Sequence, residues 1–381
     1  MANERIFSNA RVVLPDAVLQ RGSVCVRDGV IVAIDNSPSR STSAHDLDGD
    51  WLLPGLVELH TDNLERHVTP RPRVTFPMPG AVQAHDAEMA AAGITTVFDA
   101  IGVGDPYADG FRALDQSELL DALDSLEQSD ALRADHLIHV RCELPAPNAR
   151  ELFAPFARHR RLALISLMDH TPGQRQWRDL DHARVFYTGR KGWSDAQFDE
   201  QVRLAPQRQA MHARPNKAWF VDFAHTHGVA LATHDDTTVE QVDEAVLLGA
   251  GMSEFPTTIE AAQRARDCGL ATVAGAPNVV RGGSHSGNVN AVDLARRRLL
   301  DGLSSDYVPS SLLQAAWLLM REEAFAPFEA ITLVTAGPAR AARLLDRGAI
   351  ARGQRADLIR VRDVRGAPVV REVWRGMRRV A

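Results

Sequence analysis

Short apolar runs alternate with helical patterns through the middle of the chain. Such alternation is typical of repeated strand–helix units, whose strands form a parallel sheet. Helical patterns lie between the runs, for example over residues 80–93 and 239–251, and both end at a glycine. The eight expected strands span residues 52–60, 94–100, 136–143, 162–169, 229–236, 251–256, 270–278 and 302–309.

The number of strand–helix units, eight, indicates which fold they build. They fit a (β/α)₈ TIM barrel, whose usual length is about 250 residues before insertions. We therefore predict the α/β class, with a barrel over residues 51–342. An open, doubly wound sheet is the alternative, but no GxGxxG pattern follows the first strand to support it.

The two ends of the chain have a different pattern. In residues 1–50, the pair Asp28-Gly29 separates two apolar runs, which indicates a β-hairpin. Residues 343–381 alternate apolar and polar side chains, which is typical of a half-buried sheet. We predict that both ends build one small β-sandwich domain, with its first part in residues 1–50 and its second part in residues 343–381.

Composition argues against several classes of protein. The formal net charge of −6 does not fit a general nucleic-acid binder, although residues 343–381 carry 11 arginines against 4 acidic residues. Three cysteines without CxxC spacing argue against a disulfide scaffold or a structural zinc cluster. The N-terminus lacks the pattern of a signal peptide, and no run approaches the ~20 apolar residues of a membrane span. We expect a cytoplasmic protein that does not bind membranes.

Histidines and carboxylates gather where the expected strands end, and these ends meet around one cavity in a barrel. His60 and Asp62 are two residues apart and therefore face one side of their strand. Burying many carboxylates without cations would be costly, so we expect one or two divalent ions. Mixed nitrogen and oxygen ligands suit Zn²⁺, Mn²⁺ or Fe²⁺. The other strand ends carry His139, Arg141, Glu143, Asp169, His170, His234, Glu254 and Asp306.

Longer motifs resemble a known superfamily. LLPGLVELH (52–60), Asp306 and GAIARGQRADLIRV (348–361) are similar to the amidohydrolase superfamily. More narrowly, motifs along nearly the whole chain, above all HTDNLE (60–65) and GGSHSGNV (282–289), resemble the PhnM-type diphosphatases of alkylphosphonate catabolism. The resemblance implies a metal-dependent hydrolase that converts α-D-ribose 1-methylphosphonate 5-triphosphate into the 5-phosphate and pyrophosphate, in the carbon–phosphorus lyase pathway.

The resemblance also guides the assignment of the metal site. Many superfamily members bridge two metals through a carbamylated lysine of strand 4. Here the two lysines are Lys191, expected in a loop, and Lys217, expected before a helix, so we expect Glu143 or else Asp169 to bridge. Asp306 is the expected general base. The predicted metal ligands are His60, Asp62, Glu143, His234, Glu254 and Asp306.

A small-molecule polyphosphate substrate needs cations and N–H donors around it. Arginine matches phosphate oxygens two at a time, and the glycine-rich run 281–288 can present backbone N–H groups. By analogy with similar barrels, we expect a homo-oligomer. The alternatives are an amidohydrolase acting on C–N bonds, such as a deacetylase or cyclic amidase, and a catalytically silent barrel. The predicted substrate-binding residues are Arg141, His170, Arg175, Lys191, Arg281, Ser284 and His285.

Overall fold

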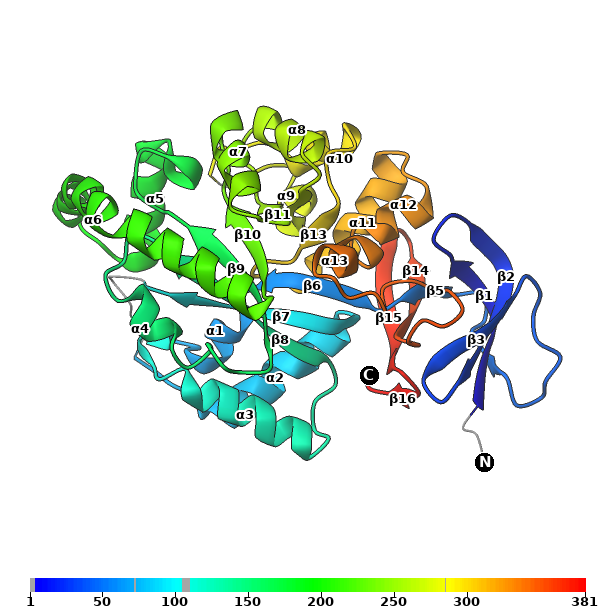
Figure 1. Cartoon of the computed structure of the whole chain (residues 1–381). Helices are drawn as coiled ribbons and strands as arrows, with labels where there is room; N and C mark the ends of the chain where they lie inside the picture. The colour runs from blue at the N-terminus through cyan, green and yellow to red at the C-terminus, as the bar shows by residue number, and fades with distance from the viewer. Residues whose placement is uncertain (1–3, 72, 105–109, 285) are drawn as a thin grey trace.

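The computed structural model describes residues 4–71, 73–104, 110–284 and 286–381, and these form two sheets (Figure 1). The larger sheet is parallel throughout and curls into a barrel with helices around it. The predicted (β/α)₈ barrel is therefore confirmed. Its strands, in the order in which they neighbour one another, are β6 (Leu56–Thr61), β7 (Ile94–Val103), β8 (Asp135–Glu143), β9 (Leu162–Met168), β10 (Ala230–His234), β11 (Met252–Glu254), β12 (Ala271–Gly275) and β13 (Gly302–Ser304).

The first expected strand serves both sheets. The run over residues 52–60 divides at Gly55 into β5 (Trp51–Pro54), which pairs in the smaller sheet, and β6, which begins the barrel. A Cβ atom at Gly55 would lie 2.2 Å from Oγ1 of Thr95, so only glycine fits at this division. One apolar run was predicted as one strand because both of its halves are buried.

Polar contacts close the barrel between its edge strands, β6 and β13. Thr61 and Asp306 form a parallel bridge. The buried carboxylate of Glu58 accepts hydrogen bonds from Oγ of Ser304 (2.7 Å) and from the main-chain N–H of Ser305 (2.6 Å). Burial raises the pKa of Glu58 to about 7, although these hydrogen bonds lower the pKa in part. The seam thus holds Asp306 beside the end of β6.

Helices and short 3₁₀ turns connect the barrel strands. The connection from β9 to β10 is the longest excursion, because it contains both α5 and the 33-residue α6, which extend away from the barrel (Figure 1). The helices are α1 (Asn63–Val68), α2 (Met78–Ala91), α3 (Ser117–Gln128), α4 (Ala149–Phe153), α5 (Leu180–Lys191), α6 (Asp195–His227), α7 (Val239–Leu247), α8 (Ile259–Asp267), α9 (Ala276–Arg281), α10 (Ala291–Arg296), α11 (Ser311–Glu322), α12 (Pro327–Thr332) and α13 (Ala336–Ala341), and the turns are η1 (Gly110–Ala113) and η2 (Arg175–Trp177).

The two lysines lie in this excursion. The expectation of Lys191 in a loop and Lys217 before a helix is wrong, because α5 ends at Lys191 and Lys217 lies within α6. Pro206 and Pro215 inside α6 hide the helix from a reading of the sequence, since proline usually ends one. Neither lysine belongs to β9, the fourth barrel strand.

Both chain ends build the smaller sheet, as predicted. It is one mixed sheet in the order β16-β15-β14-β5-β1-β2-β3, with β4 paired to β1. Phe7 and Trp374, from opposite ends of the chain, pack at its core with ring centroids 4.7 Å apart. Its strands are β1 (Glu4–Val13), β2 (Val18–Arg27), β3 (Val30–Asp35), β4 (His45–Asp46), β5, β14 (Leu358–Val364), β15 (Ala367–Arg375) and β16 (Arg378–Arg379).

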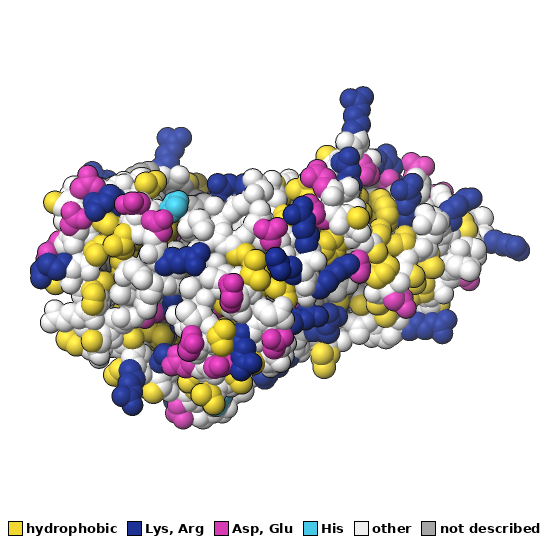
Figure 2. Space-filling model, turned by 90° about the horizontal axis from the view of Figure 1, so that it is seen from above, with side chains coloured by type: hydrophobic (Ala, Val, Ile, Leu, Met, Phe, Trp, Pro, Cys, Tyr) yellow, Lys and Arg dark blue, Asp and Glu magenta, His cyan; other side chains and the backbone are white. Residues whose placement is uncertain are grey.

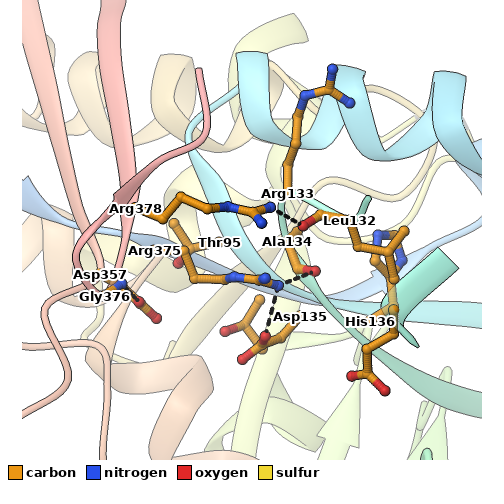
Figure 3. A network of polar contacts seen from close by, with 12 residues as sticks. Thr95, Leu132, Arg133, Ala134, Asp135, His136, Asp357, Arg375, Gly376 and Arg378 are labelled. Atoms are coloured by element: carbon orange, nitrogen blue, oxygen red, sulfur yellow. Dashed lines mark hydrogen bonds and ion pairs between the residues drawn. The ribbon is translucent and has the colours of Figure 1, made fainter. Parts of the chain in front are cut away.

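The arginine-rich C-terminal segment binds the start of barrel strand β8 (Figure 3). The guanidinium of Arg375 donates to the main-chain oxygen of Ala134 (2.8 Å) and contacts Oδ1 of Asp135 (3.0 Å). Arg347 and Arg355 reach Oδ2 of the same aspartate, at 2.8 and 2.5 Å. Burial would raise the pKa of Asp135, but Arg355 and Arg375 outweigh it and lower the pKa. Part of the local excess of arginine therefore joins the two sheets.

Charge on the surface is mixed. Figure 2 shows basic and acidic side chains interspersed over one face of the molecule. No helix among the described residues combines the length and the apolar character that crossing a membrane requires.

Candidate metal centre and its two cavities

Three barrel strands bring the first group of ligand-type side chains together at their C-terminal ends. His60 is the last residue but one of β6, His139 lies in the middle of β8 and Glu254 ends β11, and all three are buried. Nδ1 of His60 lies 3.2 Å from Oε1 of Glu254, and Nε2 of His139 lies 3.6 Å from Oε2. One carboxylate thus stands between two imidazoles, and we name these three residues the strand-end group.

A second group adjoins the first. Nδ1 of His234, at the end of β10, lies 2.6 Å from Oδ2 of Asp235, and Nε2 of His170 lies 3.8 Å from the same oxygen. The rings of His60 and His234 have centroids 5.6 Å apart, so the two groups share one region. We name His170, His234 and Asp235 the loop group.

Glu143 joins the site through the loop group. Oε1 of Glu143 accepts a hydrogen bond from the main-chain N–H of His170 (2.9 Å). Oε2 of Glu143 lies 2.5 Å from Nδ1 of His170. Burial would lower the pKa of His170, but the charge of Glu143 outweighs it and raises the pKa. Glu143 therefore fixes both the backbone and the ring of His170.

The strand-end histidines are neutral. Burial lowers the pKa of His139 to about 3, and burial together with the charge of Arg141 holds the pKa of His60 well below its usual value. Nδ1 of His139 donates to the main-chain oxygen of Leu59 (3.0 Å), so its Nε2 carries the lone pair, which accepts the hydroxyl proton of Ser166 (2.8 Å). Neutral imidazoles with a lone pair are the form in which histidine binds metal.

Unpartnered acceptors show that a cation fits here. Asp235 accepts the proton on Nδ1 of His234, so Nε2 of that ring presents a lone pair. Neither this Nε2 nor Oε2 of Glu254 has a hydrogen-bond partner among the described residues, although both are buried. Buried acceptors without donors are rare and costly. A divalent cation would satisfy both atoms, and these residue types are common ligands for one.

The structure brings part of the predicted ligand set together. His60, His234 and Glu254 lie in the two groups, and Glu143 contacts His170. Asp62 instead begins α1 as its N-cap residue and lines a neighbouring cavity. Asp306 lines the same cavity, and its main-chain N–H and C=O bond to β6 and to Asp62. Asp169 belongs to neither group, because its Oδ2 accepts Nε2 of Gln209 (2.6 Å) in a separate cavity.

Three members of the two groups are missing from the predicted ligand set, and one of them, His170, was predicted as a substrate-binding residue. His139 precedes Arg141 by two residues and Glu143 by four residues on one strand, so all three side chains face the same side of it. This spacing was the signal by which His139 could have been predicted as a ligand. Asp235 follows His234 directly, and strand alternation would turn it away. Its backbone has φ +57°, which breaks the alternation and brings the carboxylate back to its neighbour.

Two cavities open from this site. The smaller has a volume of about 130 Å³ and is lined by His60, His234 and residues of the 281–289 loop. The larger has a volume of about 1130 Å³ and extends past Glu143 and His170 to the α5–α6 excursion. Arg141, Gln176, Asp306 and Tyr307 line both, so the cavities meet beside the two histidine groups.

The predicted substrate-binding residues fall in different places. Arg141 lies at the junction of the cavities, His170 lines the larger one, and Arg281 and Ser284 line the smaller one. Arg175 is directed elsewhere, since its guanidinium donates to the main-chain oxygen of His234 (2.8 Å) and to Asp236 (3.0 Å). The side chain of Lys191 and all of His285 lie outside the described residues.

Comparisons with known proteins give one relative that is similar along the whole chain. No family model matches the chain. It is 43% identical, over 98% of its length and all of the relative's, to the alpha-D-ribose 1-methylphosphonate 5-triphosphate diphosphatase of Escherichia coli (strain K12).

Solved structures resemble the fold at low identity. Molinate hydrolase is 14% identical with a TM-score of 0.67, and the alignment covers 99% of this chain and 94% of that one. The 5-methylcytosine deaminase of Klebsiella pneumoniae is 16% identical with a TM-score of 0.65, covering 99% and 98%. These likenesses confirm the fold, whereas the identity to the curated relative extends along the whole sequence. The chain therefore belongs to the family of alpha-D-ribose 1-methylphosphonate 5-triphosphate diphosphatases.

Proposed function

We propose that the chain hydrolyses α-D-ribose 1-methylphosphonate 5-triphosphate between its α and β phosphorus atoms, giving the 5-phosphate and pyrophosphate in phosphonate catabolism. The observation that carries this proposal is the 43% identity, over 98% of the chain, to a relative of that name. The site supports it, because a positively charged arginine stands beside two groups of ligand-type side chains at the junction of two cavities.

The strand-end group and the loop group would hold one or two divalent ions, with Zn²⁺, Mn²⁺ and Fe²⁺ as the candidates. His60, His234 and Glu254 offer lone pairs there, and His139 would offer one in exchange for the hydroxyl of Ser166. Asp235 and Glu143 orient the rings of His234 and His170. Such an ion would act as a Lewis acid on phosphoryl oxygens and neutralise charge that builds up during cleavage. Asp62 and Asp306 stay candidate ligands from the wall of the larger cavity.

Asp306 is our candidate general base. Its main-chain N–H donates to the oxygen of His60 in β6 (3.1 Å), and its main-chain oxygen accepts the N–H of Asp62, the N-cap residue of α1 (3.0 Å). It has φ +55°, an uncommon conformation for aspartate, and it lines both cavities. In this position its carboxylate would accept a proton from the water that attacks the α-phosphorus.

Arg141 would neutralise the phosphoryl group under attack. Its side chain is nearly buried, and its Nε has no hydrogen-bond partner among the described residues. A guanidinium is always charged and offers N–H groups in a fixed fork that matches phosphate oxygens. A buried donor without an acceptor is costly, so an anion at the cavity junction would stabilise this side chain.

The test is an assay of pyrophosphate release by metal-loaded protein. We expect α-D-ribose 1-methylphosphonate 5-triphosphate to yield equal amounts of pyrophosphate and 5-phosphate. Hydrolysis of acylated amines alone would support a C–N amidohydrolase instead. No turnover with any of the three metals would support a silent barrel. We also propose a cytoplasmic homo-oligomer, which sedimentation of the purified protein and cell fractionation would test.

A further inference from the structure

The two cavities differ in size and in chemistry, and this difference gives the substrate a direction. Cleavage between the α and β phosphorus atoms divides the substrate into a compact pyrophosphate and a longer ribosyl phosphonate. The reacting phosphorus must lie at the metal-type residues, which is where the cavities meet. Each half of the substrate must then enter one cavity.

The smaller cavity has the features of an anion site. Its volume of about 130 Å³ is below the 300–1,000 Å³ typical of pockets for drug-sized ligands, so only a small group fits. Ser286 lines it and is only 4% exposed, yet its Oγ has no hydrogen-bond partner among the described residues. Arg281, in the last turn of α9, adds a positive charge to the same wall.

The loop around Ser286 is already shaped for this role. The main-chain N–H of Ser286 donates to Oγ of Ser284 (3.1 Å), so the turn holds its own form without using Oγ of Ser286. Gly282 has φ +77°, which lets the chain leave α9 sharply and brings the loop over the cavity. A buried, unpartnered hydroxyl on a residue that lines a cavity is the kind of donor that a phosphate oxygen satisfies.

The larger cavity suits a sugar with a variable substituent. It is lined by aromatic rings of the α5–α6 excursion, among which Tyr187 and Trp193 stack with centroids 4.8 Å apart. Arg71, Arg112 and Arg208 line it as well, with Arg112 paired to Glu65 (2.9 Å), and guanidinium groups in the wall fit an anionic phosphonate. Its volume of about 1130 Å³ exceeds what a ribosyl methylphosphonate requires.

We propose that pyrophosphate occupies the smaller cavity beside Ser286 and Arg281, and that the ribosyl phosphonate occupies the larger cavity beside Tyr187 and Trp193. This inference rests on the proposed function. In the reaction, the water oxygen bonds to the α-phosphorus and the bond to the α–β bridging oxygen breaks. The leaving pyrophosphate keeps that bond's electron pair, and Asp306 takes the water's proton. The enzyme would then fix the length of the polyphosphate and tolerate different groups on the anomeric carbon.

Product binding tests the direction without requiring turnover. Calorimetric titration of the metal-loaded protein measures Kd for pyrophosphate and for ribose 5-phosphate. We expect Ser286→Ala to raise Kd for pyrophosphate by about tenfold or more and to leave ribose 5-phosphate unchanged, since a hydrogen bond to a charged group is lost. We expect Tyr187→Ala to raise Kd for ribose 5-phosphate and to leave Kd for pyrophosphate unchanged. Val185→Ala changes an exposed side chain of the same helix and serves as the matched control.

The outcomes separate this inference from the function itself. If Ser286→Ala weakens the binding of ribose 5-phosphate and leaves that of pyrophosphate unchanged, the two halves of the substrate occupy the opposite cavities and the inference is overturned. Equal weakening of both products would overturn it too, because the cavities would not be separate subsites. These results are obtained whether or not the wild-type protein releases pyrophosphate, which is the separate test of the proposed function.

Substrate analogues give a second test. We expect a benzylphosphonate analogue to keep kcat/KM within about tenfold of the methyl compound, because the larger cavity has room for it. A 5-tetraphosphate should lose at least about 100-fold in kcat/KM, since a cavity of about 130 Å³ has little space for a third leaving phosphate. A protein that accepts the tetraphosphate and rejects the benzyl group would overturn the assignment.

Discussion

The barrel contains two sets of histidines and carboxylates that look alike in composition and differ in how their atoms are partnered. One set is the strand-end group with the adjoining loop group. The other is a buried triad of His85 in α2, Asp99 in β7 and His136 in β8. In the triad, as in the strand-end group and in the loop group, one ligand atom from each of the three residues lies within 4.8 Å of the others. Proximity alone therefore does not separate a metal centre from a structural network.

In the buried triad, both ring nitrogens of each histidine have partners. Asp99 lies 2.7 Å from Nε2 of His85 and 2.8 Å from Nδ1 of His136. The other nitrogen of His85 accepts from Nδ2 of Asn63 (3.1 Å), and that of His136 lies 3.3 Å from Asp86. His136 thus faces a carboxylate on each side and is held as the protonated imidazolium. Nothing in this arrangement needs an added ion.

At the strand ends, by contrast, Nε2 of His234 and Oε2 of Glu254 are left unpartnered among the described residues. The comparison teaches that the unsatisfied atoms, more than the residue types, mark the place for a ligand. The following predictions test this distinction.

The largest expected effect comes from replacing a histidine in each set by glutamine. His60→Gln should reduce bound metal and lower kcat by at least about 10³-fold, because Lewis-acid stabilisation is worth several kcal/mol. His85→Gln should leave the bound metal at the wild-type level. Metal analysis of both purified proteins, with kcat from pyrophosphate release, checks this. Loss of metal from His85→Gln alone would reverse our assignment of the two sets.

Next in size is the change Asp306→Asn. We expect kcat to fall by about 10²–10⁴-fold, which is the usual contribution of a general base, while the metal content stays near that of the wild type. Steady-state kinetics and metal analysis on the same preparation measure both. Near-wild-type turnover would remove Asp306 from the role of base.

Asp99→Asn should lower the stability of the fold without lowering the metal content. It leaves the positively charged His136 facing one carboxylate where it had two, and breaking a buried ion pair costs about 3–5 kcal/mol. Denaturant unfolding measures the loss, and metal content per folded molecule should be unchanged. A variant with full stability and reduced metal would show that the triad is the metal centre.

The smallest expected effect is a pH dependence of stability. Burial would lower the pKa of His136, but Asp99 and Asp86 outweigh it and raise the pKa to about 9. The unfolded histidine titrates near 6.5, so this contribution is complete below about pH 6.5 and is lost as the pH rises to about 9. Across this range the free energy of unfolding of the wild type should fall by on the order of 3 kcal/mol more than that of His136→Gln. Denaturant unfolding at several pH values measures it, and an equal fall in the two proteins would contradict the prediction.

The sequence allowed the fold to be predicted because the signals were local. Each barrel strand is a short apolar run bounded by a helix or a turn, and all eight were found. His60, His234 and Glu254 could be grouped because the ends of parallel strands meet. Asp235 could not be placed, since its positive φ angle of 57° turns its side chain away from where alternation would put it. Arg175 could not be placed either, because its partners, the main-chain oxygen of His234 and Asp236, follow it by 59 and 61 residues and meet it only in the folded chain.

The difference between the two histidine sets was also hidden from the sequence. It depends on Asn63, Asp86 and Asp99, which come from three separate elements and meet only in the folded chain. The length of α6 was missed for a similar reason, because its two internal prolines are tolerated only in the tertiary context.

The contact between the two sheets has a consequence for the order in which the protein can form. Asp135 is bound by Arg347, Arg355 and Arg375, which follow it by 212, 220 and 240 residues. At ribosomal rates of about 5–20 residues per second, these arginines emerge roughly 10 to 50 seconds after it. Throughout that interval the base of β8 carries a carboxylate without its cations. The contact that joins β8 to the smaller sheet therefore forms only after β15 has emerged, although the last barrel strand, β13, already ends at Ser304.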